Sequence, residues 1–239
     1  MIGLFYNLST GFSFMLSFKG CHFPQEVILM AIRWYIAYPL SYRHVEELME
    51  ERGVQLDHAT VNRWVIKYSS LLESQFRQTK KLIGMSWRMD ETYLKVKGQW
   101  CYYYRAVDKE NQTVDFFLSL NRDTQAAVAF FEKAIGSSGQ PEKINMDKSG
   151  ANLAGLEQIN DSLPEENKII IRQVKYLNNL IEQDHRAIKR IIKPMLGFKS
   201  FICAAATLAG IELYHMIKKG QNALKGTLTA WQQFYALAL

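Results

Sequence analysis

The hydrophobic and polar positions of the chain alternate with a helical period at its start, a strand period in its middle and a helical period again towards its end. From Pro24 onward, apolar residues recur every three or four positions, which predicts a helix. Ser41 and Asp57 are suitable N-cap residues for two further helices, and Gly53 ends the first of these two. Residues 19–82 are therefore predicted to form a small helical module.

The second and third of these helices have the pattern of a helix-turn-helix. A short helix, a turn containing a glycine and a second helix with a polar, basic start are typical of this DNA-binding motif. The predicted outward face carries the candidate DNA-binding residues Thr60, Asn62, Arg63 and Lys67. Asn62 and Arg63 are residue types that read base edges, whereas Lys67 suits a phosphate contact. A plain three-helix bundle with a solvated face fits the same pattern and stays open at this point.

Beyond a predicted linker at Arg77–Gly84, the hydrophobic period changes to that of strands. Three runs rich in aromatic and β-branched residues follow, namely WRMDETYLKV, WCYYYRAV and TVDFFLS. A helix in TQAAVAFFEKAI, a short strand in KINMD, a helix near residues 151–160, a strand in IIIRQV and a helix from about Asn178 complete the series. The order is β-β-β-α-β-α-β-α, which predicts a mixed α/β domain over residues 83–195. Residues 196–239 are predicted to form a C-terminal helical tail.

The last helix of this domain, within KYLNNLIEQDHRAIKRIIK, has two distinct stripes. The predicted buried stripe consists of Ile181, His185, Ile188 and Ile192. The second stripe has one carboxylate followed by three cations: Glu182, Arg186, Lys189 and Lys193. The carboxylate can bind a divalent metal and the cations can hold the phosphates of a polyanion. A salt-bridged, solvated helix face is the alternative that this stretch alone does not exclude.

The composition is that of an ordinary globular protein, and its charge favours an acidic partner. The chain has 239 residues, of which 48% are hydrophobic and 22% charged, and its formal net charge is +6. This excess points first to nucleic acid and second to an anionic membrane. The three cysteines, Cys21, Cys101 and Cys203, share no CxxC spacing, which argues against a zinc ribbon or a disulfide framework and favours free thiols in a reducing cytoplasm.

The first residues resemble a targeting segment only superficially. No positive charge precedes the apolar stretch, and polar residues interrupt it, so it is a poor signal peptide. We expect residues 1–18 to be an N-terminal extension, with Met15 as a plausible internal start. No later stretch reaches the ~20 apolar residues of a membrane span, so no membrane partner is expected.

Three acids occupy unusual places in the predicted topology. Asp90 lies inside the first strand, Asp147 at the exit of the fourth strand and Glu182 in the last core helix. Ionised groups in such places need partners, and three converging acids repel one another unless cations neutralise them. Two divalent metals held ~4 Å apart do this in phosphoryl transfer, and Mg²⁺ suits oxygen ligands. If the three acids converge, they can therefore form a catalytic and metal-binding site for two Mg²⁺ or Mn²⁺ ions.

Neighbouring polar residues are predicted to have supporting roles. Glu91 alternates away from Asp90 and should point to the opposite face of the strand. Asp108 and Asp184 suit turns, caps or supporting positions. His185, three residues after Glu182, forms a Glu-x-x-His pair of the di-iron type, but a single copy is insufficient for such a site, so a packed core histidine is the preferred interpretation.

At the level of whole motifs, the chain resembles the bacterial insertion-sequence transposases of family six. The matching stretches are FKGCHF, SYRHVEELMEERGVQLDHATVNRWV, MDETYLKVKGQWCYYYRAVD, TVDFFLS, KYLNNLIEQDHRAIKR, GFKS and GIE. The resemblance runs from about Phe18 to Gln221 and implies the ribonuclease-H-like core of DDE transposases and retroviral integrases. It also implies that Asp90, Asp147 and Glu182 form the metal-binding triad and that Lys189 touches the DNA end. The residues around Asp147 differ from the family's usual Thr-Asp-Ala.

The resemblance implies a transposase that cleaves at the ends of an insertion sequence and joins the 3′-OH to target DNA. No covalent protein–DNA intermediate is needed. The helical module would bind the terminal inverted repeats, and pairing two ends implies a homodimer or a larger assembly in the bacterial cytoplasm, at the nucleoid. A catalytically inactive copy that only binds DNA is one alternative, and a metal-dependent nuclease without a joining step is another.

Overall fold

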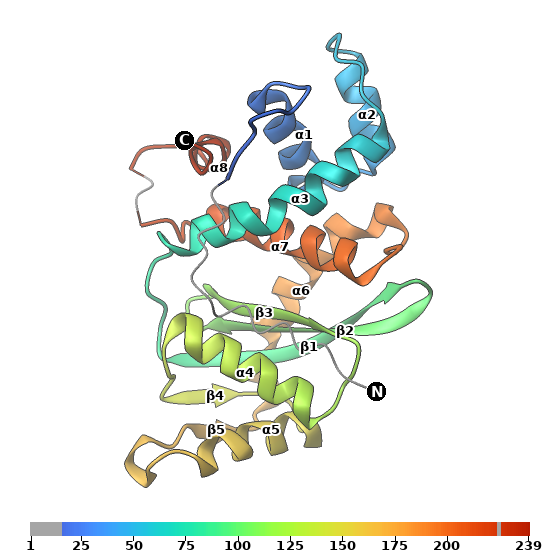
Figure 1. Ribbon diagram of the computed structural model, residues 1–239. Coiled ribbons are helices and arrows are strands. Elements are labelled where there is room, and N and C mark those ends of the chain that lie inside the picture. Colours follow the sequence, from blue (N-terminus) through green and yellow to red (C-terminus); the bar gives the residue numbers. More distant parts are fainter. Residues whose placement is uncertain (1–15, 224–225) are drawn as a thin grey trace.

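The structure is a computed structural model that describes residues 16–223 and 226–239 (Figure 1). The predicted N-terminal extension lies, up to residue 15, outside the described residues. The helices are α1 (Gln25–Ala37), α2 (Tyr42–Glu50), α3 (His58–Arg77), α4 (Thr124–Ser138), α5 (Gly150–Asp161), α6 (Asn179–Ile192), α7 (Phe201–Lys218) and α8 (Ala230–Ala236). The strands are β1 (Ser86–Val96), β2 (Gln99–Asp108), β3 (Thr113–Ser119), β4 (Lys143–Asn145) and β5 (Ile170–Arg172). The predicted order β-β-β-α-β-α-β-α is confirmed.

The N-terminal helices begin at the residues that their capping chemistry predicts. The Ser41 hydroxyl accepts a hydrogen bond from the backbone N–H of His44 at 3.2 Å, and the His44 ring accepts one from the Ser41 N–H, which closes a reciprocal cap. Asp57 caps α3 by accepting from the Thr60 N–H. Gly53 has a φ of +73°, a conformation that glycine adopts without strain, and it turns the chain between α2 and α3.

The five strands form one mixed sheet in the order β3-β2-β1-β4-β5. β1, β2 and β3 are antiparallel, whereas β1, β4 and β5 are parallel. β4 pairs only with Ser86–Arg88 of β1, and within the described chain the next bridge on that side of β1 joins Val96 to Phe198. The middle of β1 is therefore open towards one side, and α6 packs there.

Two helical layers cover the two faces of the sheet (Figure 1). α4 and α5 bury one face, where Trp87, Met89 and Tyr104 meet Phe130 and Phe131. On the other face the core continues without a break from the sheet into α7, α3 and α1. α7 is long and apolar enough to cross a membrane by composition alone, but 72% of that window is buried inside the fold, which identifies it as a core helix.

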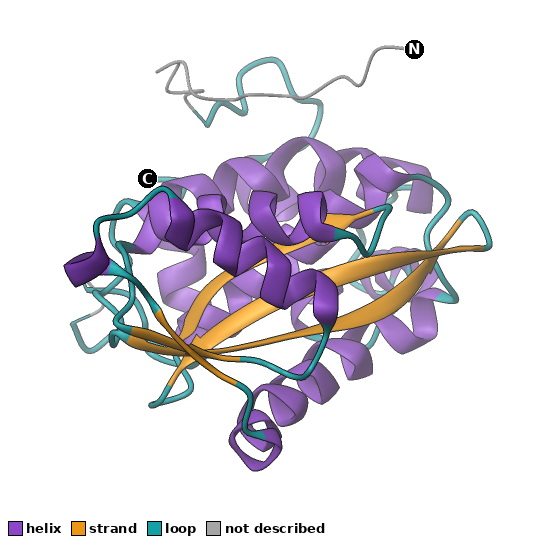
Figure 2. Cartoon of the chain, turned by 90° about the horizontal axis from the view of Figure 1, so that it is seen from below, coloured by secondary structure: helices purple, strands orange, loops and turns teal. Residues whose placement is uncertain are grey.

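The β1–β2 hairpin extends beyond its neighbours in the sheet. β3 pairs with β2 only from Tyr102 onward, so the hairpin end lies past the edge of β3 (Figures 1 and 2). Lys97 and Gly98 both have positive φ, 51° and 78°, as a two-residue type I′ turn requires. The tip of this hairpin is thus held by its own tight turn and by backbone hydrogen bonds to Phe198.

Candidate active site

The pairing of β1 with β4 brings two of the predicted acids together. Arg88 is opposite Asn145, and each strand carries an aspartate two residues further on, Asp90 and Asp147. Because the strands are parallel, the two side chains arrive at the same end of the sheet. Carboxylate oxygens of Asp90, Glu91 and Asp147 all lie within 4.8 Å of one another. These three residues are called the acid cluster below.

Glu91 belongs to the cluster but already has partners of its own. Its carboxylate is 5% exposed, forms an ion pair with Arg122 and accepts a hydrogen bond from Asn152 Nδ2 at 2.7 Å. Burial lowers the pKa of Arg122, but the attraction of Glu91 more than offsets this, and the net pKa is raised. These partners come from the α4 and α5 side, as strand alternation predicts. The charge of Glu91 is therefore balanced within the protein.

The negative charges of the two aspartates are balanced by fewer protein groups than that of Glu91. The Asp147 side chain is 42% exposed, and its Oδ1 accepts a hydrogen bond from the Ser149 N–H at 3.0 Å, which starts the turn into α5. Arg122 lies 3.9 Å from its other oxygen, at the limit of an ion pair. The Asp90 side chain is 20% exposed, and its Oδ2 lies 3.4 Å from Nε2 of His185. Both carboxylates therefore keep oxygen atoms available for a ligand.

Glu182 lies near the cluster without joining it. It is exposed in the first turn of α6, and its carboxylate is not among the oxygens that lie within 4.8 Å of one another. Among the residues that the structure describes, Glu182 has no hydrogen-bond or ion-pair partner. One helical turn further on is His185, which contacts Asp90. Glu182 thus precedes by about one helical turn the residue that contacts Asp90.

The two stripes of α6 follow the predicted pattern with one shift. Arg186, Lys189 and Lys193 are exposed on the same side as Glu182. The buried stripe consists of Ile181, Asp184, His185, Ile188 and Ile191. Ile192, which was predicted to be buried, is only partly so, because the stripe drifts by one position over the length of the helix.

His185 is a core histidine, as predicted. It is 5% exposed, and burial lowers the pKa of its imidazole against the opposing effect of Asp90. Its Nδ1 atom has no hydrogen-bond partner in the described structure. The neutral ring lies between α6 and β1, with Nε2 beside the carboxylate of Asp90.

A buried ionic network behind the cluster was not predicted from the sequence. Arg105 of β2 is fully buried and donates to Asp184 Oδ2 at 2.7 Å and to Glu212 Oε2 at 3.0 Å. Lys219 donates to Asp184 at 2.7 Å, and Tyr103 donates to Glu212 at 2.6 Å. The signal for this network was present: Arg105 interrupts an apolar strand and Glu212, of the GIE motif, interrupts an apolar helix.

The network fixes α6 against the sheet. Asp184 belongs to α6, Arg105 to β2 and Glu212 to α7, so the ion pairs join three elements at the centre of the fold. Burial alone would raise the pKa of Asp184, but the hydrogen bond from His215 and the charges of Arg105 and Lys219 hold it below its ordinary value. Asp184 therefore fixes α6 to the core of the fold rather than serving as a turn or cap residue. Glu182, two residues before it, lies on the exposed face of the same helix.

The candidate DNA-binding residues of α3 differ in how far their side chains are exposed to solvent. Arg63 is exposed and donates to the Thr60 hydroxyl at 2.6 Å, and Lys67 is exposed one turn later. Asn62 is partly buried, and its Oδ1 accepts from the Cys203 thiol at 3.4 Å, at the start of α7.

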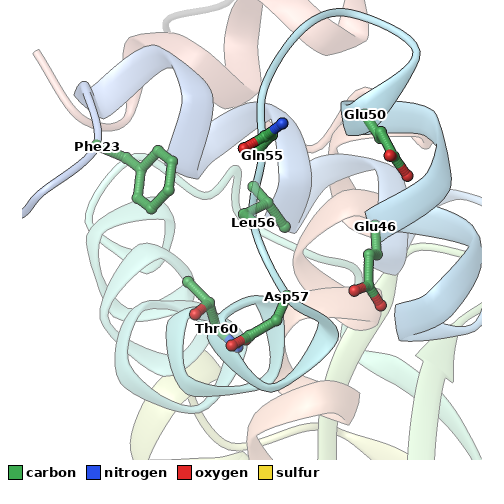
Figure 3. Close-up of a pocket in the computed structure, with 7 residues that line it drawn as sticks. All are labelled: Phe23, Glu46, Glu50, Gln55, Leu56, Asp57 and Thr60. Atoms are coloured by element: carbon green, nitrogen blue, oxygen red, sulfur yellow. The ribbon is translucent and has the colours of Figure 1, made fainter.

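Acidic side chains flank the start of α3. Figure 3 shows Glu46, Glu50 and Asp57 lining a surface pocket between α2 and α3, together with Thr60. Glu46 is hydrogen-bonded to the ring of His58 at 3.0 Å. These carboxylates disfavour a phosphate at the first turn of α3, so its exposed cations further along the helix are better placed for DNA.

The acid cluster fits a divalent metal by its chemistry. Its donor atoms are carboxylate oxygens, which are the ligands that Mg²⁺ and Mn²⁺ prefer. The site combines a mixed sheet, an aspartate inside β1, a second aspartate just after the parallel strand β4, and a glutamate in the first turn of α6. This combination is typical of a ribonuclease-H-like core that acts on phosphodiesters.

Comparison with known proteins agrees with this class. Residues 84–221 match the family described as DDE domain, and residues 26–140 match the transposase IS66 family. The chain is 38% identical over 209 residues to the transposase for insertion sequence-like element IS431mec of Staphylococcus aureus (strain Mu50), covering 87% of this chain and 92% of that protein. The transposase for insertion sequence element IS257 in transposon Tn4003 of Staphylococcus aureus matches to the same extent.

Among solved structures, the HTLV-2 integrase catalytic core domain in complex with magnesium, in its trimeric form, matches with a TM-score of 0.43 and 19% identity, covering 54% of this chain and 84% of that one. The sequence comparisons carry the assignment by themselves. The chain belongs to the DDE transposases, and its relatives place it in insertion-sequence family six. Members of this family depend on divalent metal ions, consistent with the acid cluster.

Proposed function

We propose that this transposase cleaves at the ends of its insertion sequence and joins the freed 3′-OH to target DNA at a site formed by Asp90, Asp147 and Glu182. The observation that carries the proposal is the convergence of Asp90, inside β1, with Asp147, just after the parallel strand β4. The cleavage and joining steps are both displacements at phosphorus, so one site serves both.

Each acid has a role that its surroundings support. Asp90 and Asp147 would hold two Mg²⁺ or Mn²⁺ ions, because their oxygens converge and lack the full set of partners that Glu91 has. Glu182 would complete the set, since it is exposed and unpaired within the described chain. Bound there, such ions activate the attacking oxygen and stabilise the leaving one. The protein contributes no covalent nucleophile.

The cations of α6 and α3 would hold DNA around this site. Arg186, Lys189 and Lys193 continue from Glu182 along one exposed helix face, which suits successive phosphates of a strand that enters the site. On α3, Arg63 and Lys67 would contact the terminal inverted repeats, with Thr60 and Asn62 completing the recognition face. Because two element ends must be joined together, a homodimer or a larger assembly at the nucleoid is expected.

The test is a strand-transfer assay with a labelled element end. With Mg²⁺ or Mn²⁺, the wild type should join the 3′-OH to a target duplex, whereas Glu182→Gln, which keeps the size of the side chain and removes its charge, should not. Equal joining by both proteins would remove Glu182 from the site. Cleavage without joining by the wild type would identify a nuclease instead of a transposase.

A further inference from the structure

A groove lies between the end of the β1–β2 hairpin and α6, next to the face proposed to hold DNA. Its volume is about 670 Å³. Two aromatic side chains of the hairpin line it, Tyr93 and Trp100. Five cations surround them: Lys95, Arg186, Lys189, Arg190 and Lys193. None of the lining residues is acidic, so no carboxylate of the lining neutralises the positive charge beside the aromatic rings. We call it the aromatic–basic groove.

The two rings are held in place but remain open to solvent. Tyr93 is opposite Tyr102 and Lys95 is opposite Trp100, so Tyr93 and Trp100 are diagonal neighbours on one face of the hairpin. Their centroids are 4.9 Å apart at an interplanar angle of 82°. Tyr93 is 57% exposed and Trp100 is 53% exposed. Large rings that keep half their surface in water on a fixed hairpin are typical of a binding surface.

Cations already contact both rings. Lys95 Nζ lies 4.9 Å from the centroid of the Trp100 ring, and Lys189 Nζ lies 5.4 Å from that of Tyr93. Lys189 is also one of the α6 residues proposed to hold DNA phosphates. A strand that follows the exposed face of α6 therefore passes directly over the rings.

We infer that the aromatic–basic groove binds an unpaired base of this DNA strand by stacking it on Trp100 and Tyr93. The inference rests on the proposed function, because it assigns a subsite to the same DNA. Aromatic rings beside a basic groove are the combination with which proteins hold single-stranded nucleic acid, and stacking tolerates any base. Bases within a duplex are stacked on each other and cannot offer their faces to a ring.

The position of the groove relative to the acids agrees with this role. Tyr93 is three residues beyond Asp90, or about 10 Å along the strand. Lys189 is seven residues beyond Glu182, also about 10 Å along its helix. The groove would therefore take a base within a few nucleotides of the phosphate that reacts. An unpaired base held there keeps the reacting strand apart from its complement near the acid cluster.

A second copy of this chain is a less suitable occupant. Pairing two copies of the groove would bring ten cations together with no carboxylate of the lining to neutralise them. The charge of the groove is complementary to a polyanion, and its rings are complementary to a base.

The inference is tested by the binding of a labelled oligothymidylate and of a labelled duplex of the same length to the full chain, measured by fluorescence anisotropy at one salt concentration. Trp100→Leu and Tyr93→Leu should each weaken single-strand binding about tenfold. Duplex binding should stay unchanged. Trp100→Phe should restore single-strand binding, because it keeps a ring. The control Trp231→Leu removes a similarly exposed indole, 48% exposed, from α8 outside the groove and should behave as wild type.

Three results would overturn the inference. Trp100→Leu and Tyr93→Leu could bind oligothymidylate as well as the wild type does, or they could lose single-strand and duplex binding equally. They could also change the sedimentation of the protein with single-strand binding unaltered, which would identify a second copy as the occupant. Strand transfer measured on the same preparations separates the two proposals. A wild type that needs Trp100 to bind single strands but never joins ends would refute the proposed function alone.

Discussion

At the scale of single residues, the distinction between Glu91 and Glu182 defines the site. Glu91 adjoins Asp90 in β1 and Glu182 lies one turn before the histidine that contacts Asp90, but the two glutamates have opposite surroundings. Glu91 is nearly buried and is paired with Arg122 and Asn152, whereas Glu182 is exposed and unpaired among the described residues. A carboxylate that already has an internal cation is a poor ligand for another one. We therefore propose the catalytic role for Glu182 and a supporting role for Glu91.

This assignment predicts different losses for the two glutamine variants. Glu91→Gln should lower strand transfer by no more than the ~10–100-fold typical of a partner outside the ligand set. Glu182→Gln should lower it further, because a ligand is lost. The measurement is the rate of joining of a pre-cleaved element end at saturating Mg²⁺. A larger loss in Glu91→Gln than in Glu182→Gln would show that the acid cluster itself is the complete metal site.

Lys189 allows a second test at this scale, on DNA affinity. Lys189→Ala should weaken DNA binding and reduce the slope of log affinity against log salt by about one, as expected when one phosphate contact is lost. The control is Lys109→Ala, which removes an exposed lysine from the β2–β3 turn, where it pairs with Glu110. If the slope of Lys189→Ala equals that of the wild type, the lysine does not contact a phosphate.

At the scale of elements, the buried network that anchors α6 is the main stabilising feature behind the site. Glu212 on α7 is fully buried between Arg105 and Tyr103. Burial would raise the pKa of this carboxyl, but the guanidinium of Arg105 outweighs it, and the net pKa is lowered. A buried charge of this kind is stabilising only while its partners are present.

Glu212→Gln should therefore lower the free energy of unfolding by about 3–5 kcal/mol at neutral pH, because Arg105 loses a buried counter-charge. The folded pKa of Glu212 is below its unfolded value, so its contribution is fully present above pH ~4.3 and is lost as the pH falls below that value. The difference between wild type and variant in urea unfolding should thus shrink below about pH 4. The exposed Glu132→Gln on α4 is the control, and an equal effect of the two variants would contradict the account.

The sequence predicted the helices and strands better than it predicted the side-chain contacts between them. The caps at Ser41 and Asp57 and the strand and helix order depend on local chemistry, which the sequence carries directly. Asp90 and Asp147 could be singled out because a strand interior and the end of a strand are unusual places for ionised acids. The pairing of Arg105 with Glu212 could not be predicted, because partners so distant in the chain meet only after the sheet and α7 have packed together.

At the scale of the whole molecule, one core joins the helical module to the catalytic sheet. Buried residues of α1, α3 and α7 form a continuous cluster with Leu94 and Tyr103 of the sheet. The functional division into residues 19–82, 83–195 and 196–239 remains a prediction. The helix α3, which is proposed to hold DNA, and the sheet that carries Asp90 therefore pack around one core.

The most direct test of the central claim is the joining of a pre-cleaved, labelled element end to target DNA by wild type and Asp147→Asn, titrated with Mg²⁺ from a metal-free start. We expect no joining without a divalent metal, joining by the wild type that rises with metal concentration, and none by Asp147→Asn. Joining in the presence of a chelator, or equal joining by Asp147→Asn, would contradict it.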